Sequence, residues 1–515
     1  MERGVLVAGR REWLGLAVLV LPVLLVSVTV TVLYFALPFL SADLAPTGSQ
    51  LLWIIDVYAF LLAGLLIPMG ALGDRIGRRR LLLAGATAFG VMSIAAAFAP
   101  DAGSLIAARA LQGAAAASLM PPTLALIRDM FHDPRQRRMA VAVWSAGFAG
   151  GSVLGPIVGG WLLEHLWWGS VFLINVPVMV LLLVLGPIVL PEYRDPGPGR
   201  FDLPSAALSL AAVLPAVYAI KQFADGGSGP QVLLGAAAGA AAGAAFLRRQ
   251  RTLSAPMLDL RLFAGRDLTV SLVTSTLAIF ALVGLFYFVT QYLQMVLGLR
   301  PLAAGLLTLP AAGAALAGSV LAAAIARWAR PGHIVGGGMA LVAGGFLVMS
   351  RIEADSERWF LVFGLFLLGA GIGAVQATAS DLVVAAAPPE RAGSASAIME
   401  AATELGGALG VAILGSVGLA AYGERFAATA PALPPEYAEA ARETLGGAVG
   451  VAARMPGEAG AALLDAARQA FTGGMQVAAL LGAFVMALTA ILAAILLRPA
   501  RADPGGPTPR RPRRR

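Results

Sequence analysis

The sequence predicts an all-α polytopic membrane protein with fourteen membrane-spanning helices. Of its 515 residues, 58% are hydrophobic and 13% are charged, whereas soluble domains carry about 25% charged residues. Fourteen apolar stretches are long enough to cross a bilayer, which takes about 20 residues. The basic residues gather between alternate stretches, as membrane topology requires. Together these observations exclude a soluble protein.

The apolar stretches define the spans in chain order. We expect them at 13–40, 51–72, 81–99, 104–127, 139–163, 169–190, 203–222, 231–247, 268–292, 302–326, 332–350, 359–382, 393–418 and 474–497. The first stretch is too long to be the apolar region of a cleavable signal peptide, so we expect it to remain as a span. The eighth is the weakest, because it is short and consists mostly of Ala and Gly.

The basic residues test the number of spans. With a cytoplasmic N-terminus, 28 of the 37 basic residues fall on the inner side, 8 on the outer side, and Arg109 within a span. Adding or removing one span midway would destroy this asymmetry, so it supports fourteen spans with both termini cytoplasmic. Lys221, the one lysine, counts among the outer residues at a span end, and we attribute the scarcity of lysine to a GC-rich genome. The net charge of +8 is therefore a topology signal and not a nucleic-acid-binding surface.

The spans group naturally as six, two and six. Transporters with internal repeats are built from two bundles of six spans each, and the substrate path lies between the two bundles. The predicted parts are a cytoplasmic N-terminal tail (1–12), a first six-helix bundle (13–190), two additional helices with their flanking loops (191–267), a second six-helix bundle (268–497) and a basic cytoplasmic tail (498–515).

A long outer segment interrupts the second bundle. Residues 419–473 are expected to form an extracellular loop with amphipathic stretches near 434–446 and 457–472. We expect this loop to cover the outer mouth of the substrate path. On the opposite side the C-terminal tail ends in RRPRRR, and we expect it to contact anionic lipid.

The loop after the second span reads GALGDRIGRRR over 70–80. Asp74 stands there beside Arg75 and Arg78 in a turn framed by glycines. A carboxylate in this position can cap a helix and pair with arginines across a domain seam, which makes a latch that breaks when the cytoplasmic side opens. Membrane anchoring alone explains the arginines but not the Gly and Asp spacing. We therefore predict gating roles for Asp74, Arg75 and Arg78.

Two features inside the spans also indicate conformational change. Arg109 lies about one and a half turns into the fourth span, where a buried arginine marks a pathway or a paired acid; the alternative is snorkelling to the outer surface. The fifth span contains GFAGGSVLGPIVGG over 147–160. Its small residues, including Gly151 and Gly155, allow close helix packing in lipid, and Pro156 adds a bend. Such a face suits helices that shift against each other, and equally a helix that is simply well packed.

Three carboxylates inside the predicted spans are candidates for proton coupling. Asp56 lies in the outer third of the second span, and Glu400 and Glu404 lie one turn apart on one face of the thirteenth. Ionisable groups within the membrane are costly and usually have a functional role. A carboxylate in this position can exchange a proton for a lipophilic cation. Two carboxylates so close also disfavour joint ionisation. We favour coupling over a structural role for Asp56, and Glu404 over Glu400.

The loop, the Arg109-Gln112-Gly113 segment and the glycine-rich helix, in this order, resemble the signature motifs of the major facilitator superfamily. Fourteen spans point to its fourteen-helix drug:proton antiporter family, and the chain is similar to bacterial pumps for quaternary ammonium compounds, dyes and quinolones. Further matching segments are VLYFALP (32–38), LWIIDVY (52–58), FLINVP (172–177), PMLDLRLF (256–263) and ELGGALGVAILGS (404–416). The resemblance implies two six-helix bundles that rock about a central cavity. It assigns the conformational switch to Asp74, Arg75, Arg109, Gly151, Gly155 and Pro156.

One position departs from the family pattern. Members usually carry an Asp in the first span, seven residues before the Ala-Leu-Pro, where this chain has Thr29. A hydroxyl forms hydrogen bonds but does not exchange a proton at neutral pH. We therefore expect a changed proton stoichiometry or a preference for less charged substrates.

Large apolar and aromatic side chains are candidates for the cavity wall, because sites for lipophilic compounds are lined by such groups. Helix packing or an interfacial belt explains each of them equally well. The candidates are Trp53, Tyr58, Trp144, Phe172, Phe286, Tyr287, Tyr292 and Met295, together with the polar Thr29.

These observations predict a proton-driven multidrug efflux transporter of the bacterial inner membrane that works by alternating access. Its expected partners are small lipophilic or cationic drugs, protons and membrane lipids, with no nucleic acid, and we expect a monomer. No cofactor is expected, since the chain lacks a GxxxxGK[ST] loop for a nucleotide and the energy then comes from an ion gradient. We expect no enzyme, because no nucleophile–base pair or metal cluster stands out. Two alternatives stay open, namely a dedicated exporter of one metabolite, antibiotic or lipid, and a membrane sensor or scaffold that does not transport.

Overall fold

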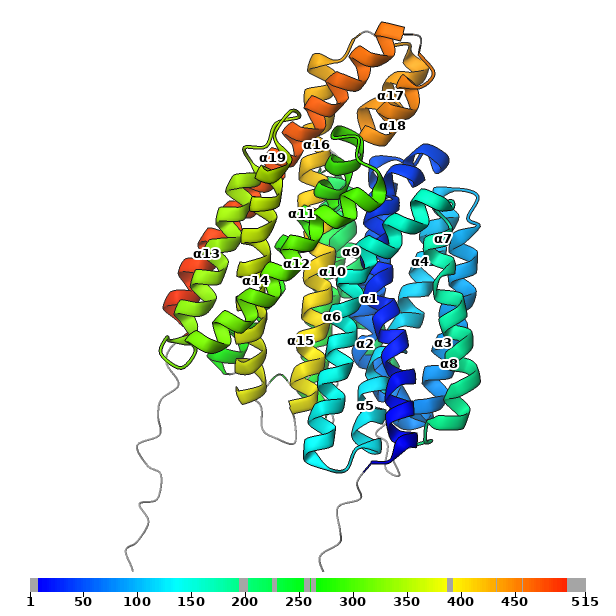
Figure 1. Ribbon diagram of the computed structural model, residues 1–515, viewed down its shortest axis with the longest axis vertical. Helices are drawn as coiled ribbons and strands as arrows, with labels where there is room; N and C mark the ends of the chain where they lie inside the picture. Colours follow the sequence, from blue (N-terminus) through cyan, green and yellow to red (C-terminus); the bar gives the residue numbers. More distant parts are fainter. Residues whose placement is uncertain are drawn as a thin grey trace, which may run out of the picture.

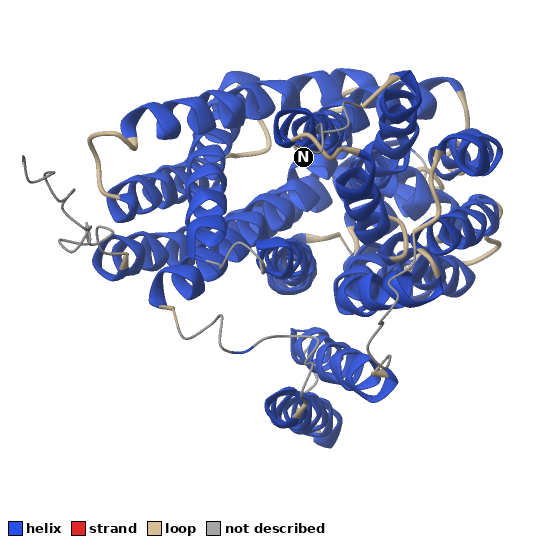
Figure 2. Ribbon diagram, turned by 90° about the horizontal axis from the view of Figure 1, so that it is seen from below, coloured by secondary structure: helices blue, strands red, loops and turns tan. Residues whose placement is uncertain are grey.

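The computed structural model describes residues 8–193, 202–224, 229–253, 260, 265–386, 392–431, 433–455 and 457–497. Within these ranges every regular element is a helix, and no strand is present (Figure 2). Fourteen helical spans are long and apolar enough to cross a membrane, which confirms the predicted all-α fold and the number of spans. The predicted basic tail 498–515 lies outside the described residues.

The helices follow the chain in three groups. The first group is α1 (Arg10–Leu44), α2 (Gly48–Ile76), α3 (Arg78–Ala97), α4 (Ala102–Ala117), α5 (Met120–Met130), α6 (Pro134–His165), α7 (Ser170–Leu173) and α8 (Asn175–Val189). The insert is α9 (Leu203–Ala224) and α10 (Pro230–Thr252). The second group is α11 (Arg266–Gln291) with the π-helical turn η2 (Tyr292–Val296), α12 (Pro301–Ile325), α13 (Pro331–Met349), α14 (Arg358–Ala386), α15 (Ala392–Gly410) with the π-helical turn η4 (Val411–Gly415), α16 (Ser416–Thr429), α17 (Pro435–Glu443), α18 (Leu445–Ala452) and α19 (Gly457–Leu496).

Local sequence signals explain several helix ends. Thr47 caps α2 by accepting the backbone N–H of Gln50 at 3.2 Å. Asp133 caps α6 in the same way, and the hydrogen bond from the Gln136 backbone N–H lowers the pKa of this carboxyl. Between α2 and α3, Gly77 has a φ of 111°, a conformation that side chains disfavour, so that one residue separates two helices.

The first and second groups form two bundles that lie side by side (Figure 1). The start of α1 and the end of α19 lie at one end of the molecule, here called the termini end. The short helices α17 and α18 lie at the opposite end, here called the hairpin end (Figure 1). The two halves meet along α2 with α15 and along α6 with α12.

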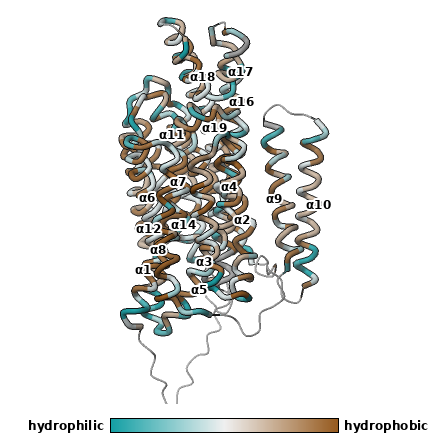
Figure 3. Tube along the Cα trace, turned by 90° about the vertical axis from the view of Figure 1, so that its right-hand side faces the viewer, coloured by the Kyte–Doolittle hydropathy of each residue, from teal (hydrophilic) through white to brown (hydrophobic). Residues whose placement is uncertain are grey.

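The insert stands beside the two bundles (Figure 3). Its helix α9 packs on α2, η4 and α16, and α10 packs mainly on α9. One apolar cluster joins Phe60 of α2, Val217 of α9, Ala408 of α15 and Ala412 of η4. The helix α9 therefore lies at the seam between the halves and contacts both.

The described residues of the predicted outer segment 419–473 are largely helical, and the extracellular location of this segment stays a prediction. Helix α16 continues to Thr429, and the stretch 457–472 is the first part of α19, a single helix of 40 residues. The amphipathic stretch near 434–446 is divided between α17 and α18. Pro431 and Pro434 lie between α16 and α17, where proline favours a break because it has no N–H to continue a helix. The hydropathy of the sequence predicts where α16 leaves the membrane, whereas the end of the helix lies further along the chain, just before Pro431.

Three hydrogen bonds join the two halves at the hairpin end. The Gly48 N–H donates to Glu443 Oε2 at 2.9 Å. Gln294 Nε2 donates to the Phe35 carbonyl at 3.2 Å, and the Leu302 N–H of α12 donates to Glu164 Oε1 of α6 at 3.1 Å. Because Glu443 ends α17, this hairpin helps to hold the halves together; whether it closes a substrate path stays a prediction.

Candidate functional site

A buried ion pair joins α9 to α2. The Lys221 ammonium lies 2.7 Å from the Asp56 carboxylate, and the two side chains are 2% and 0% exposed. The Lys221 nitrogen also lies 4.4 Å from the centre of the Trp53 ring, in cation–π contact. A carboxylate and an aromatic face bind organic ammonium ions, so these residues can hold a cation inside the membrane.

The position of Lys221 corrects the sequence prediction, which places this residue on the outer side and treats it as incidental. A lysine near a span end can turn its long side chain inward when a buried carboxylate offers a partner. The sequence carries a signal for this pairing. Asp56 lies in the first third of α2 and Lys221 near the end of α9, and because successive spans alternate in direction, the two opposite charges are expected at a similar depth.

Helices from both halves pack around the pair. Helix α2, which carries Asp56, contacts α4, α9 and α15, and Arg109 of α4 donates to the carbonyl of Ile54, two residues before Asp56. The helices that carry the predicted ionisable side chains therefore meet at α2, although they are far apart in the sequence.

Arg109 is 1% exposed and does not snorkel to a surface. Its Nε donates to the Ile54 carbonyl at 3.2 Å, and a terminal nitrogen donates to Gln112 Oε1 at 2.8 Å. The guanidinium lies 4.2 Å from the centre of the Tyr58 ring. A carbonyl, an amide and a ring thus hold this cation between α2 and α4.

A chain of buried polar side chains leads from Arg109 to Thr29. Gln112 Nε2 donates to Ser93 Oγ at 2.8 Å, and Asn175 Nδ2 donates to the same oxygen at 3.3 Å. Thr29 Oγ1 donates to Asn175 Oδ1 at 2.9 Å. The position at which the sequence departs from its family is therefore connected to Arg109 through α8, α3 and α4.

Glu400 and Glu404 lie on α15, which packs against α2. Both side chains are partly exposed, in contrast to the sealed Asp56. Neither pairs with a basic side chain in the described part of the chain. Ala401, between them in sequence, packs against the core of the first half. Glu400 and Glu404 thus lie on the helix of the second half that meets α2 at the seam.

The predicted gating loop forms an ionic network within the first half. Arg78 lies 2.8 Å from Asp74 and 2.7 Å from Asp129 of α5, and Arg75 is exposed. Asp129 is a partner that the sequence analysis did not single out. The predicted pairing across the seam is not made by Asp74 or Arg78 in this structure, because α5 supplies the nearer carboxylate.

We expect Arg78→Ala to destabilise the fold more than Arg80→Ala. Removing Arg78 leaves Asp74 and Asp129 facing each other without their shared cation, which costs about 2 kcal/mol for lost charged hydrogen bonds. The control side chain of Arg80 is 71% exposed and lies 3.7 Å from Glu192. The measurement is the midpoint of thermal unfolding in detergent, and equal midpoints for the two variants would contradict the importance of the network.

The glycine-rich helix α6 lies between α1 and α12. A Cβ on Gly151 or Gly155 would collide with α1. On the other side, a Cβ on Gly305 of α12 would lie 2.5 Å from the Pro156 carbonyl oxygen. The predicted close packing is thus present on two faces, one within the first half and one across the seam, as a helix that transmits motion between halves requires.

The predicted aromatic residues divide into two kinds. Trp53 contacts Lys221, and Phe286 meets Tyr34 edge to face at 5.6 Å between centroids, so that both lie in the neighbourhood of Asp56. Tyr292 instead donates to a backbone carbonyl in the loop between α13 and α14, and Trp144 donates to a threonine of α5. Packing accounts for the last two.

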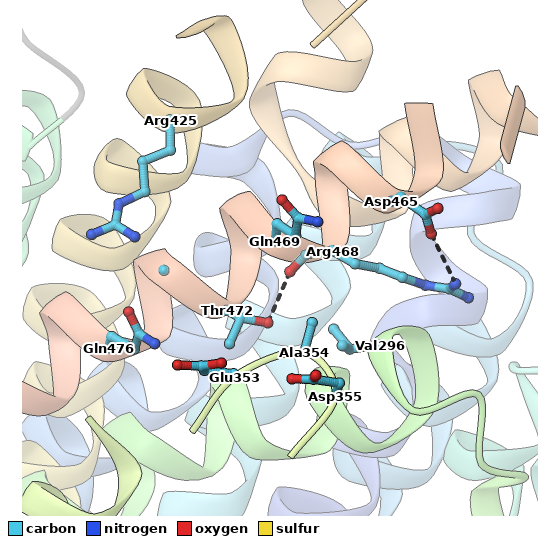
Figure 4. A pocket seen from close by; sticks show the side chains of 11 residues that line it. Val296, Glu353, Ala354, Asp355, Arg425, Asp465, Arg468, Gln469, Thr472 and Gln476 are labelled. Atoms are coloured by element: carbon cyan, nitrogen blue, oxygen red, sulfur yellow. Dashed lines mark hydrogen bonds and ion pairs between the residues drawn. The ribbon is translucent and has the colours of Figure 1, made fainter. Parts of the chain in front are cut away.

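A separate polar cavity of about 560 Å³ opens at the hairpin end of the second half (Figure 4). Its lining includes Glu353 and Asp355 before α14, Arg425 of α16, and Asp465 and Arg468 of α19. The two α19 residues form an ion pair at 3.8 Å. None of the residues predicted for coupling or substrate binding lines this cavity.

Comparison with known proteins agrees with this architecture. Residues 19–411 match the family model described as Major Facilitator Superfamily. The multidrug efflux pump LfrA of Mycolicibacterium smegmatis is 44% identical over 489 residues, covering 95% of this chain and 97% of the relative. The methyl viologen resistance protein SmvA of Salmonella typhimurium is 38% identical over 469 residues, covering 91% of this chain and 94% of the relative.

A solved structure shares the fold. It is a bacterial homologue of the human lysosomal transporter Spinster, in an inward-facing and unoccupied conformation. The TM-score is 0.68 at 19% sequence identity, over 95% of this chain and 98% of that chain. The arrangement of helices is thus common to both chains despite their low sequence identity.

Proposed function

This chain belongs to the major facilitator superfamily, and we propose from that premise that it is a multidrug efflux transporter which exchanges lipophilic, mainly cationic compounds for protons. Relatives that share most of its length are named as a multidrug efflux pump and as a methyl viologen resistance protein. With fourteen spans it is a multi-pass membrane protein, which in bacteria lies in the inner membrane. It is a transporter and not an enzyme.

The observation that carries the proposal is the sealed Asp56 carboxylate. It lies 2.7 Å from a cation and beside an aromatic face, inside the membrane-spanning part. A carboxylate attracts a lipophilic cation when ionised and releases it when protonated, and alternation between these two states is antiport. Glu404 and Glu400 lie on α15, which packs against α2, and in this proposal they pass the proton onward.

The energy of a proton gradient is adequate for this task. When the exchange moves one net positive charge inward, as with two protons for one monovalent cation or one proton for a neutral compound, a membrane potential of roughly 150 mV supplies about 3.5 kcal/mol. That supports a concentration gradient of roughly a few hundred-fold. The positive-inside asymmetry supports a cytoplasmic location of both termini, so that the hairpin end faces outward.

Purified protein in proteoliposomes tests the proposal. Ethidium, a quaternary ammonium compound and a quinolone are added in turn, and the internal pH is followed with an enclosed dye. A substrate-dependent pH change with several unrelated cations supports proton-coupled multidrug export. Export without any pH change would refute proton coupling, and a response to one compound class alone would refute a multidrug pump.

A dedicated exporter of one less charged compound is the second candidate, and Thr29 favours it. This residue is 2% exposed and bonded to Asn175, so a neutral group stands where family members usually carry an acid. A strong response to a neutral compound added to this panel, with no response to the cations, would select this candidate.

We expect Thr29→Asp to raise the number of protons exchanged per substrate and to favour dications such as methyl viologen. The new carboxylate would face Asn175, whose amide can donate to it, and would add a second exchangeable proton to the first half. The ratio of proton to substrate flux measures the effect. Thr29→Asn is the matched neutral control, and equal ratios for the two variants would show that position 29 does not set stoichiometry.

A further inference from the structure

Lys221 is a buried cation for which export of a drug has no obvious need. We propose that Lys221 acts as a tethered cation. Without substrate, its ammonium pairs with the Asp56 carboxylate, and a cationic substrate binds to that carboxylate by displacing the ammonium. The inference rests on the proposed function and deepens it, because it names what the substrate must compete with. It also makes α9, which lies outside both six-helix bundles, a part of the transport cycle.

The geometry around the Lys221 ammonium is that of an alkylammonium binding site. The nitrogen lies between the Asp56 carboxylate at 2.7 Å and the face of the Trp53 ring at 4.4 Å. A substrate ammonium would seek the same two groups, since charge pairing and cation–π contact are the interactions open to it. Lys221 therefore occupies the place in which a cationic drug is expected.

The burial of the pair makes its separation dependent on a replacement. Both side chains are almost wholly sealed from solvent, and a buried charge without its partner is strongly unfavourable. Lys221 can leave Asp56 readily only when another cation takes its place or a proton neutralises the carboxylate. A Lys221 ammonium that has left Asp56 therefore indicates that a substrate cation or a proton has bound to the Asp56 carboxylate.

The insert is built to move as one body. Arg249 of α10 forms a two-pronged ion pair with Asp202, the residue just before α9, at distances from 2.8 Å, and Gln250 Nε2 donates to Ser205 Oγ at 2.8 Å. Hydrogen bonds from the Arg249 guanidinium hold the pKa of Asp202 below its usual range, so the tie stays charged at neutral pH. A Cβ on Gly239 would lie 2.9 Å from the α9 backbone, which shows how closely the two helices pack.

The contacts between the α9–α10 insert and the two bundles are weaker than the contacts between α9 and α10. Ser209 Oγ of α9 donates to the Gly64 carbonyl of α2 at 3.2 Å, and Val217 packs with Phe60 and Ala412. The Lys221–Asp56 ion pair is the charged contact between α9 and α2. Its release would leave the Ser209 hydrogen bond and the apolar contacts, so displacement of one side chain would loosen the attachment of the insert.

Lysine labelling tests the inference directly, because Lys221 is the only lysine of the chain. Protein in lipid nanodiscs is treated with an amine-acetylating reagent at mildly alkaline pH, and peptide mass spectrometry follows acetylation of Lys221. The N-terminal amine serves as the internal reference. We expect ethidium to raise the labelling rate of Lys221 about tenfold and to leave the reference amine unchanged.

Four variants sharpen the test. Asp56→Asn should label quickly without ethidium and show no further rise, since the partner is gone. Tyr218→Phe, on an exposed side chain of the same helix (43% exposed), should respond as the unchanged protein does. Lys221→Met should bind ethidium about tenfold more tightly than Lys221→Arg, because arginine keeps a competing cation on the tether.

The outcomes separate this inference from the proposed function. Ethidium binding, seen by its fluorescence, together with an unchanged labelling rate and equal affinities of Lys221→Met and Lys221→Arg would overturn the tethered cation and leave the pump intact. Failure of ethidium and the other cations to bind or move at all would overturn the proposed function and this inference with it.

Discussion

Asp56→Asn is expected to abolish substrate-dependent proton movement and to lower export of cations by about a hundredfold, equivalent to about 3 kcal/mol of lost charge interaction. The amide keeps the shape of the side chain but cannot release a proton or carry a negative charge. Asp56 is completely buried beside its cation, so no water compensates for the lost charge. The measurement is the paired flux of ethidium and protons in proteoliposomes.

Folding and function must be separated in this experiment, because Asp56→Asn leaves Lys221 buried without its charged partner. The double variant Asp56→Asn with Lys221→Met removes both charges and should regain thermal stability, since neutral replacement of a buried pair is often tolerated. It should still fail to couple protons. Asp381→Asn, an exposed acid at one end of α14, is the control and should transport normally. A proton signal that survives in Asp56→Asn would instead move coupling to Glu404 and Glu400.

Gly151→Ala is expected to disrupt export and to destabilise the protein by about 2 kcal/mol through overpacking. A Cβ at this position would collide with the Leu24 carbonyl and lie 2.8 Å from Ser27 Cβ. The obstacle is the backbone of α1, which cannot move aside as a flexible side chain would. Helices α1 and α6 would therefore be forced apart along the face that the GFAGGSVLGPIVGG motif provides.

The neighbouring glycine offers a matched control for this variant. A Cβ on Gly150 meets nothing within 4 Å, so Gly150→Ala makes the same chemical change one residue earlier in open space. We expect it to retain export and its midpoint of thermal unfolding. Equal behaviour of the two variants, measured by ethidium flux and thermal unfolding, would show that close α1–α6 contact is not needed.

Much of the site could be predicted because polar groups are rare in membrane spans. Asp56, Arg109, Glu400 and Glu404 stand out in apolar segments, and the structure packs the helices that carry them, α4 and α15, against α2. The glycine motif predicted close helix contact, and the structure shows it on α1 and α12. Whether these residues carry protons stays a prediction.

The partners of these residues could not be predicted in the same way. Asn175 is an ordinary residue in FLINVP until the fold places it against Thr29, and Asp129 is a charge at a helix end until α5 brings it to Arg78. Lys221 was missed because charge counting assigns sides of the membrane, not contacts. The depth of a residue in the membrane follows from the hydropathy of its own segment, whereas its contact partner belongs to another helix and depends on the fold.

The sequence by itself determined the all-α class, the fourteen spans and the family, because apolar length, charge asymmetry and ordered motifs are properties of the chain in one dimension. It left open where the helices of residues 419–473 begin and end and which charges pair. Only the tertiary structure decided that α9 lies at the seam, that Lys221 forms an ion pair with Asp56, and that the ion pairs of Arg78 stay within one half. The physical reason is that bilayer insertion is governed by local hydropathy, while ion pairs form between whichever distant groups packing brings to the same depth.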